Sequence, residues 1–153
     1  MVEDYEQELT SNPGAGQAFT ATAFGGLPYA LGTASGAIPI DIAAGEPLQA
    51  MMQCTQNFDA LTSAVFDVLA CDDAAGTNPV TLATSGAITL ANLTTANTPT
   101  KRLGGIIPAG LITTAKKFIL AKYTLTGTQP TVGKMRIWLQ KSVDVLPVNK
   151  GAL

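Results

Sequence analysis

The stretch Lys134-Met135-Arg136-Ile137-Trp138-Leu139-Gln140-Lys141 alternates between apolar side chains and polar or amphipathic ones. Successive side chains of a β-strand point to opposite faces, so this pattern predicts a strand with one apolar face turned inward. The other face carries Lys134, Arg136 and Trp138, the only Trp in the chain. Trp and Arg are enriched at binding hot spots, so we interpret this face as a candidate contact with another chain. Plain surface and burial under a loop are the alternatives for Trp138.

Short apolar stretches recur along the chain between turn signals such as Gly25-Gly26 and Gly45-Glu46-Pro47. About nine short strands with this spacing predict an all-β fold, namely a single jelly roll or antiparallel β-sandwich with an extended N-terminal arm. We expect strands at residues 17–23, 37–42, 48–55, 64–71, 80–83, 87–90, 103–107, 117–125 and 134–141.

Composition suggests three segments and one domain. Residues 1–16 are acidic and contain the turn residues Asn12, Pro13, Gly14 and Gly16, so we interpret them as an arm and linker. Residues 17–146 are the predicted jelly-roll domain, and residues 147–153 are a C-terminal tail. The chain has about twenty Thr residues and only 13% charged residues, whereas a soluble domain usually has about 25%. Such a weakly charged, Thr-rich β-domain suggests that much of its surface is buried in an assembly.

The charges are sorted by position. Residues 1–100 hold ten acids and no bases, whereas residues 101–153 hold nine bases and only Asp144, so −10 and +8 sum to the net charge of −2. We predict that the acidic arm meets the basic C-terminal third, in the same chain or in a neighbouring one. The candidate interface residues are Glu3, Asp4, Glu6 and Glu8 of the arm, with Lys134, Arg136 and Trp138 of the last strand.

The sequence predicts neither an enzyme nor a cofactor site. The chain has no His, which excludes Ser-His-Asp and Cys-His catalysis and His-ligated metals. Cys54 and Cys71 are expected on opposite sides of their sheets, where they cannot form a disulfide. Asp72 and Asp73 remain a weak alternative for a calcium loop, and our preferred reading has no metal.

Asp67 lies mid-strand among apolar residues, so we expect it to pair with a Lys or Arg of the C-terminal third. The N-terminus lacks the basic start and apolar core of a secretory signal, and no apolar run approaches the roughly 20 residues of a membrane span. We therefore expect synthesis in cytoplasm and no membrane partner. Lys116, Lys117 and Lys122 look superficially like a nucleic-acid patch, but the acidity of the whole chain argues against that partner.

Three blocks of sequence carry a resemblance. They are residues 17–23 (QAFTATA), residues 40–42 with 45–48 (IDI and GEPL), and residues 117–127 (KFILAKYTLTG), followed by Gly133 and the closing strand. In their order and total length they resemble the capsid cement (decoration) protein family of tailed bacteriophages, typified by the Bordetella phage cement protein. The likeness covers most of the chain, but residues 72–100 are longer and richer in Thr than the family pattern.

The resemblance implies a jelly roll on the outer surface of an icosahedral head, made in the cytoplasm of a bacterial host. It also implies a homo-oligomer, with a dimer slightly favoured over a trimer, that clamps neighbouring major capsid proteins together and has no catalytic residues. The alternative is a carbohydrate-binding or host-adhesion module on the same architecture, such as a tail-fibre or lectin-like domain. A glycosidase with paired carboxylates is the third hypothesis, but the acids form no convincing pair.

Overall fold

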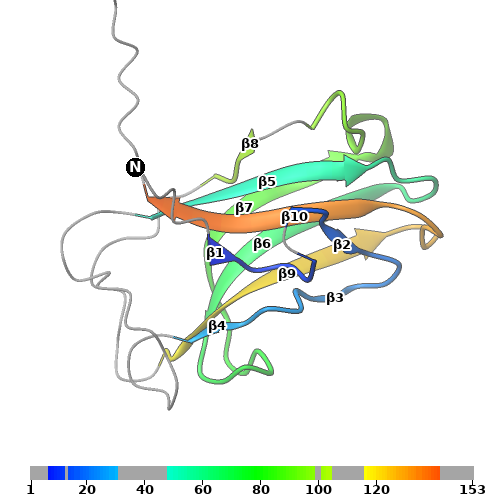
Figure 1. Ribbon diagram of the computed structural model, residues 1–153. Coiled ribbons are helices and arrows are strands. Elements are labelled where there is room, and N and C mark those ends of the chain that lie inside the picture. The colour runs from blue at the N-terminus through cyan, green and yellow to red at the C-terminus, as the bar shows by residue number, and fades with distance from the viewer. Residues whose placement is uncertain (1–6, 13, 31–47, 99–100, 105–115, 142–153) are drawn as a thin grey trace, which may run out of the picture.

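The computed structural model describes residues 7–12, 14–30, 48–98, 101–104 and 116–141. Within these ranges the chain is nearly all β-structure, and two five-stranded antiparallel sheets pack face to face as a sandwich (Figure 1). The helical part of these ranges is a three-residue 3-10 helix, Leu90–Asn92. The predicted all-β fold is confirmed.

The sheets are called A and B here. Sheet A contains β1 (Gln7–Glu8), β2 (Gln17–Ala18), β5 (Leu48–Gln56), β8 (Lys101–Arg102) and β10 (Lys134–Lys141). Sheet B contains β3 (Ala23–Phe24), β4 (Tyr29–Ala30), β6 (Ser63–Cys71), β7 (Val80–Thr89) and β9 (Phe118–Thr126).

The strand order is that of a jelly roll. Sheet A runs β1-β10-β5-β8 with β2 on the same edge of β10 as β1, and sheet B runs β3-β9-β6-β7 with β4 on the same edge of β9 as β3. Each sheet therefore has four strand positions. Consecutive positions along the chain alternate between the sheets, except for the β6–β7 hairpin inside sheet B. This connectivity is the double Greek key that defines the jelly roll.

The long strands β5, β6, β9 and β10 lie within a residue or so of their predicted ranges. The sequence predicts two strands at 80–83 and 87–90, but β7 is continuous because a bulge keeps it paired with β6. At the bulge the Ser85 hydroxyl accepts the Phe66 N–H at 2.9 Å, and Gly86 supplies a φ of 65°. The predicted strand 17–23 is split into β2 and β3. Residues 37–42 and 105–107 lie outside the described residues.

The split of the first predicted strand closes one long side of the sandwich. β1 and β2 both pair with β10, and the chain then crosses to sheet B, where β3 and β4 pair with β9. A backbone bridge joins the sheets near the start of this segment, because Leu9 donates to Ile137 O (2.9 Å) and accepts from Leu27 N (3.3 Å). The described part of the predicted arm, residues 7–12 and 14–16, thus contributes a strand and the buried Leu9 to the sandwich.

A second segment closes the opposite long side. β8 pairs with Met51 and Met52 of β5, and Leu103 N donates to Ala50 O at 2.9 Å. The next residue, Gly104, exchanges two backbone hydrogen bonds with Thr84 of β7, at 2.8 and 2.9 Å. Both long sides of the sandwich therefore have backbone hydrogen bonds that pass from one sheet to the other.

Gln17 fixes the place where the N-terminal segment changes sheets. Its side-chain oxygen Oε1 accepts the backbone N–H groups of Ser11 (3.0 Å) and Gly26 (2.9 Å), and its side-chain nitrogen Nε2 donates to the Tyr123 hydroxyl at 3.0 Å. The Tyr123 hydroxyl in turn donates to Phe24 O at 3.0 Å. One side chain of sheet A thus holds two loops and a strand of sheet B, and burial raises the pKa of Tyr123 to about 12.

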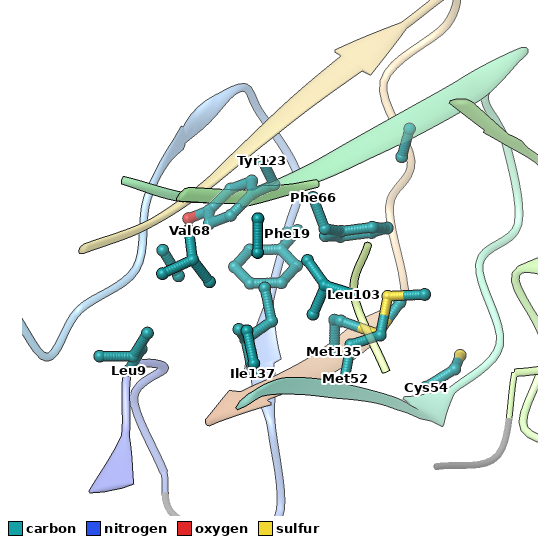
Figure 2. Packing of buried hydrophobic residues seen from close by; sticks show 14 of the residues in the cluster. Leu9, Phe19, Met52, Cys54, Phe66, Val68, Leu103, Tyr123, Met135 and Ile137 are labelled. Atoms are coloured by element: carbon teal, nitrogen blue, oxygen red, sulfur yellow. The ribbon is translucent and has the colours of Figure 1, made fainter. Parts of the chain in front are cut away.

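The core lies between the two sheets. Phe19, at the sheet crossing, packs against Phe66 and Tyr123 of sheet B (Figure 2). Met135 and Ile137 of β10 close the core from sheet A, and all five of these side chains are at most 2% exposed. The inward apolar face predicted for the last strand is confirmed.

The two cysteines are free and buried. Cys54 lies in the main core, whereas Cys71 packs with Leu69 and Leu120 on the outer side of sheet B. Their predicted placement on opposite sides is confirmed, and burial raises the pKa of both thiols. Among the described residues there is no helix of the length and apolarity needed to cross a bilayer.

Gly133 offers a test of the packing next to the sheet crossing. Its φ is 141°, and a Cβ added there would lie 2.3 Å from the Phe58 ring. We expect Gly133→Ala to lower the free energy of unfolding by about 3 kcal/mol in urea denaturation, from backbone strain plus overpacking. Gly86→Ala is the control, because Gly86 also has a positive φ (65°) but no atom within 4 Å of an added Cβ; it should lose only about 1 kcal/mol. Equal losses would contradict the packing described here.

Candidate functional site

The outer face of sheet A contains the predicted interface residues of the last strand. Lys134, Arg136, Trp138 and Gln140 of β10 alternate with side chains that enter the core. β5 lies beside β10 along its whole length, with Trp138 opposite Met51 and Arg136 opposite Gln53. This face thus combines bases, amides and one Met.

Arg136 is paired with the acidic N-terminal segment of its own chain. Its Nε lies 2.6 Å from Glu8 Oε2, and the two side chains are 17% and 7% exposed. Thr10 completes the arrangement, since its hydroxyl donates to Glu8 Oε1 at 2.7 Å and accepts the Ile137 N–H at 3.2 Å. The expectation that arm acids meet C-terminal bases is met within one chain for this pair.

Trp138 is covered in the same arrangement. The Arg136 guanidinium lies 4.3 Å from its ring centroid, a cation–π distance, and the indole Nε1 donates to Gln140 Oε1 at 3.1 Å. The residue is only 2% exposed. This burial rules out the interpretation of Trp138 as an ordinary surface residue. Because the indole is already buried in a single copy, Trp138 supports the docked N-terminal strand.

Lys134 lies apart from this cluster. Lys134 begins β10, opposite Gln56 and Ala18, at an irregularity in the strand register. It is half-buried, and its charge is not part of the Glu8–Arg136 pair. Glu3, Asp4 and Glu6 lie outside the described residues.

Asp72, one of the two aspartates considered for a calcium loop, is bound to a lysine. Lys116 Nζ lies 2.7 Å from Asp72 Oδ1 and 2.5 Å from the backbone oxygen of Asn78, whose side-chain amide donates to Asp72 Oδ2 at 2.7 Å. The hydrogen bond from Lys116 is the main reason that the pKa of Asp72 is lowered. Within the described ranges no group of three or more Cys, Asp or Glu side chains is placed to hold a metal ion.

Two further aspartates fasten loops. Asp73 accepts the Ala75 and Thr77 N–H groups and the Thr77 hydroxyl, at 2.6–3.1 Å. Asp59 accepts the N–H and hydroxyl of Thr131, in the loop that joins β9 to β10. The pKa of each carboxyl is lowered, mainly by its Thr hydroxyl. A general acid needs a raised pKa, so this environment does not suit either group to that task.

Asp67 lies on the outer face of sheet B. The strand register places it directly opposite Lys122 of β9, which is a base of the C-terminal third. Lys122 also lies over the Phe24 ring, 5.9 Å from its centroid. The sequence reasoning did not identify this face as a surface of interest, although the alternation of Ser63, Val65 and Asp67 was a usable signal.

No protein-family model matches the chain, and no curated protein matches it.

Arg136 is expected to matter for stability. Arg136→Ala removes the partner of the nearly buried Glu8 carboxylate and the group stacked on Trp138, so the free energy of unfolding should fall by about 3 kcal/mol in urea denaturation. Lys134→Ala is the control on the same strand and face, with an expected change of about 0.5 kcal/mol or less. An Arg136→Ala variant as stable as the control would contradict the role given to this pair.

The Asp72–Lys116 pair should give a pH-dependent contribution to stability. Because the folded pKa of Asp72 is lowered, its contribution is complete above the unfolded pKa of about 3.9 and is lost as the pH falls through the folded value. We expect Asp72→Asn to melt below the wild type at pH 7, and the difference to close as the pH falls below about 4. Lys116→Met should follow the same profile in thermal melts. A difference that stays constant into strong acid would show that the pair is not its source.

Proposed function

We propose that this protein is a structural virion protein that decorates the outer surface of an icosahedral phage head. It would bind folded major capsid proteins and hold neighbouring copies together. The observation that carries the proposal is a jelly roll whose two long sides are closed, which leaves broad sheet faces for contact, on a chain with strongly separated charges. The three sequence blocks that resemble phage cement proteins support the same function.

The closed sandwich suits a clamp. A decoration protein stabilises a shell by binding the assembled form in preference to its parts. A rigid binder loses less conformational freedom on binding, so it binds more tightly through the same contacts. Many copies, each with a modest interface, then add their effects over the shell. Hydrogen bonds at Leu9 and Gly104 that join the two sheets supply such rigidity.

The charges support a partner of mixed polarity. Lys134 stays outside the Glu8–Arg136 pair on the outer face of sheet A, beside the amides of that face. The acids Glu3, Asp4 and Glu6 directly precede β1, which lies at the edge of the same sheet. Together these groups could engage complementary patches on adjacent capsid subunits.

The alternative, a carbohydrate-binding or adhesion module, has less support. Sugar-binding sites of that kind present exposed aromatic rings, but Phe19, Phe66, Tyr123 and Trp138 are buried. Among the described residues, the large apolar side chains that are well exposed are Leu27, Val80 and Val132, and none of them is aromatic. A glycan-binding screen would test this alternative directly.

Co-sedimentation with undecorated heads tests the proposal. We expect saturable binding that weakens as salt rises, because the contacts include charges near the surface. A variant without residues 2–6 should bind more weakly, while its β1 strand and the Glu8–Arg136 pair stay in place. As the control for specific binding, the wild-type protein is mixed with heads whose surface loops have been removed by protease. No sedimentation with heads at low or high salt would reject the proposal.

A further inference from the structure

The outer face of sheet B changes character along its strands. Leu69, Cys71 and Leu120 form a buried apolar cluster at one end, with Phe24 and Phe118 packed against it. Asp67 and Lys122 lie opposite each other in the middle. Beyond them the described strands carry small side chains, exposed or half-buried, on this face: Ser63 and Val65 of β6, Ala87 and Thr89 of β7, and Thr124 and Thr126 of β9.

From this pattern we infer that the outer face of sheet B, from Ser63 to Asp67 and across to β9, is the contact between two copies of this chain. The two copies pack face to face about a two-fold axis, with Asp67 of each against Lys122 of the other. This inference deepens the proposed function and rests on it, because a decoration protein that acts in many copies can also bind copies of itself.

The arrangement of charge makes the face self-complementary. A two-fold axis that runs between the two packed faces, parallel to β6 and β9, exchanges the positions of these two strands. Since Asp67 and Lys122 are cross-strand neighbours, with Cβ atoms about 5 Å apart, the axis brings each acid over the other copy's base. A contact on a two-fold axis must use the same patch on both copies, and this patch satisfies that condition.

The same axis matches the small residues. Val65 of one copy faces Thr124 of the other, and Ser63 faces Thr126, because each is the cross-strand partner of the other in the register. Aligned sheets pack about 10 Å apart. Small β-branched and hydroxyl side chains lose little rotamer freedom when two sheets pack. Packing therefore contributes most of the affinity between the copies, while the charge pairs fix how the two copies align.

The opposite face is unsuited to self-packing. The outer face of sheet A carries Lys134 and Arg136 on β10, opposite Gln56 and Gln53 of β5. A similar two-fold contact there would place each base over an amide and not over an acid, so it lacks the charge pairs of sheet B. A second copy therefore fits sheet B, and the face of sheet A stays available for a different partner.

Two charge reversals test this contact, with mass and self-association constant measured by analytical ultracentrifugation. Asp67→Lys gives a face with two bases, and Lys122→Asp gives a face with two acids. We expect the wild type to dimerise and each variant alone to raise the dissociation constant about tenfold or more. An equal mixture of the two variants should recover a one-to-one dimer, because each base then meets an acid across the axis.

The mixture separates the intermolecular contact from effects within one chain. A variant weakened only by its own cross-strand repulsion gains nothing from the other variant, so a mixture that stays monomeric would overturn the inference. A monomeric wild type, or a dimer that neither reversal weakens, would also overturn it. Circular dichroism checks that each variant is folded, and the double variant D67K/K122D should dimerise like the wild type.

Lys134→Asp is the matched control, with the same charge change on the other sheet. It should leave the dimer unchanged and reduce binding to heads. If the protein binds heads but does not dimerise, the contact on sheet B has failed. If it dimerises but does not bind heads, the proposed function has failed.

Discussion

Every sheet edge in this molecule needs a partner for its backbone N–H and C=O groups, and the fold is arranged around that requirement. The N-terminal segment serves both sheets on one long side, first along β10 and then along β9. Residues 101–104 do the same on the other side, between β5 and β7. Because one segment bonds to two sheets, the sandwich is held together by directional hydrogen bonds as well as by its apolar core. The strands at both edges are short because each edge segment pairs first with one sheet and then with the other.

The separation of charge along the sequence is in part resolved inside the chain. Glu8 and Arg136 are 128 residues apart in sequence and bonded in the structure, and Asp72 and Lys116 form a second such pair. Both join an acid of the first hundred residues to a base of the last third. The charge pattern therefore guides folding as well as any contact with other molecules. In the proposed assembly the two outer faces divide the work, with sheet A for the capsid and sheet B for a second copy.

The fold was predictable because its last strand alternates clearly and its other long strands are apolar runs between turn signals. β10 shows this best, and β5, β6 and β9 also lie close to their predicted ranges. The split near Phe19 was not predictable, because a change of sheet depends on where β9 and β10 lie and leaves no local signal. A contact between arm acids and C-terminal bases was predicted by charge, but the pairing of Glu8 with Arg136 within one chain and the burial of Trp138 depend on how β1 docks. Asp67 was expected to pair with some base of the C-terminal third, whereas the position of Lys122 opposite it on the outer face follows from strand register.

The position of Trp138 has one more consequence. It is the only indole in the chain, and its ring lies under Arg136, the residue that holds Glu8 of β1. Indole fluorescence changes with solvent contact and with a nearby cation. The emission of the native protein therefore reports on whether β1 is docked, separately from the state of the core on the other side of β10. The protein thus carries an intrinsic optical probe for release of its N-terminal strand.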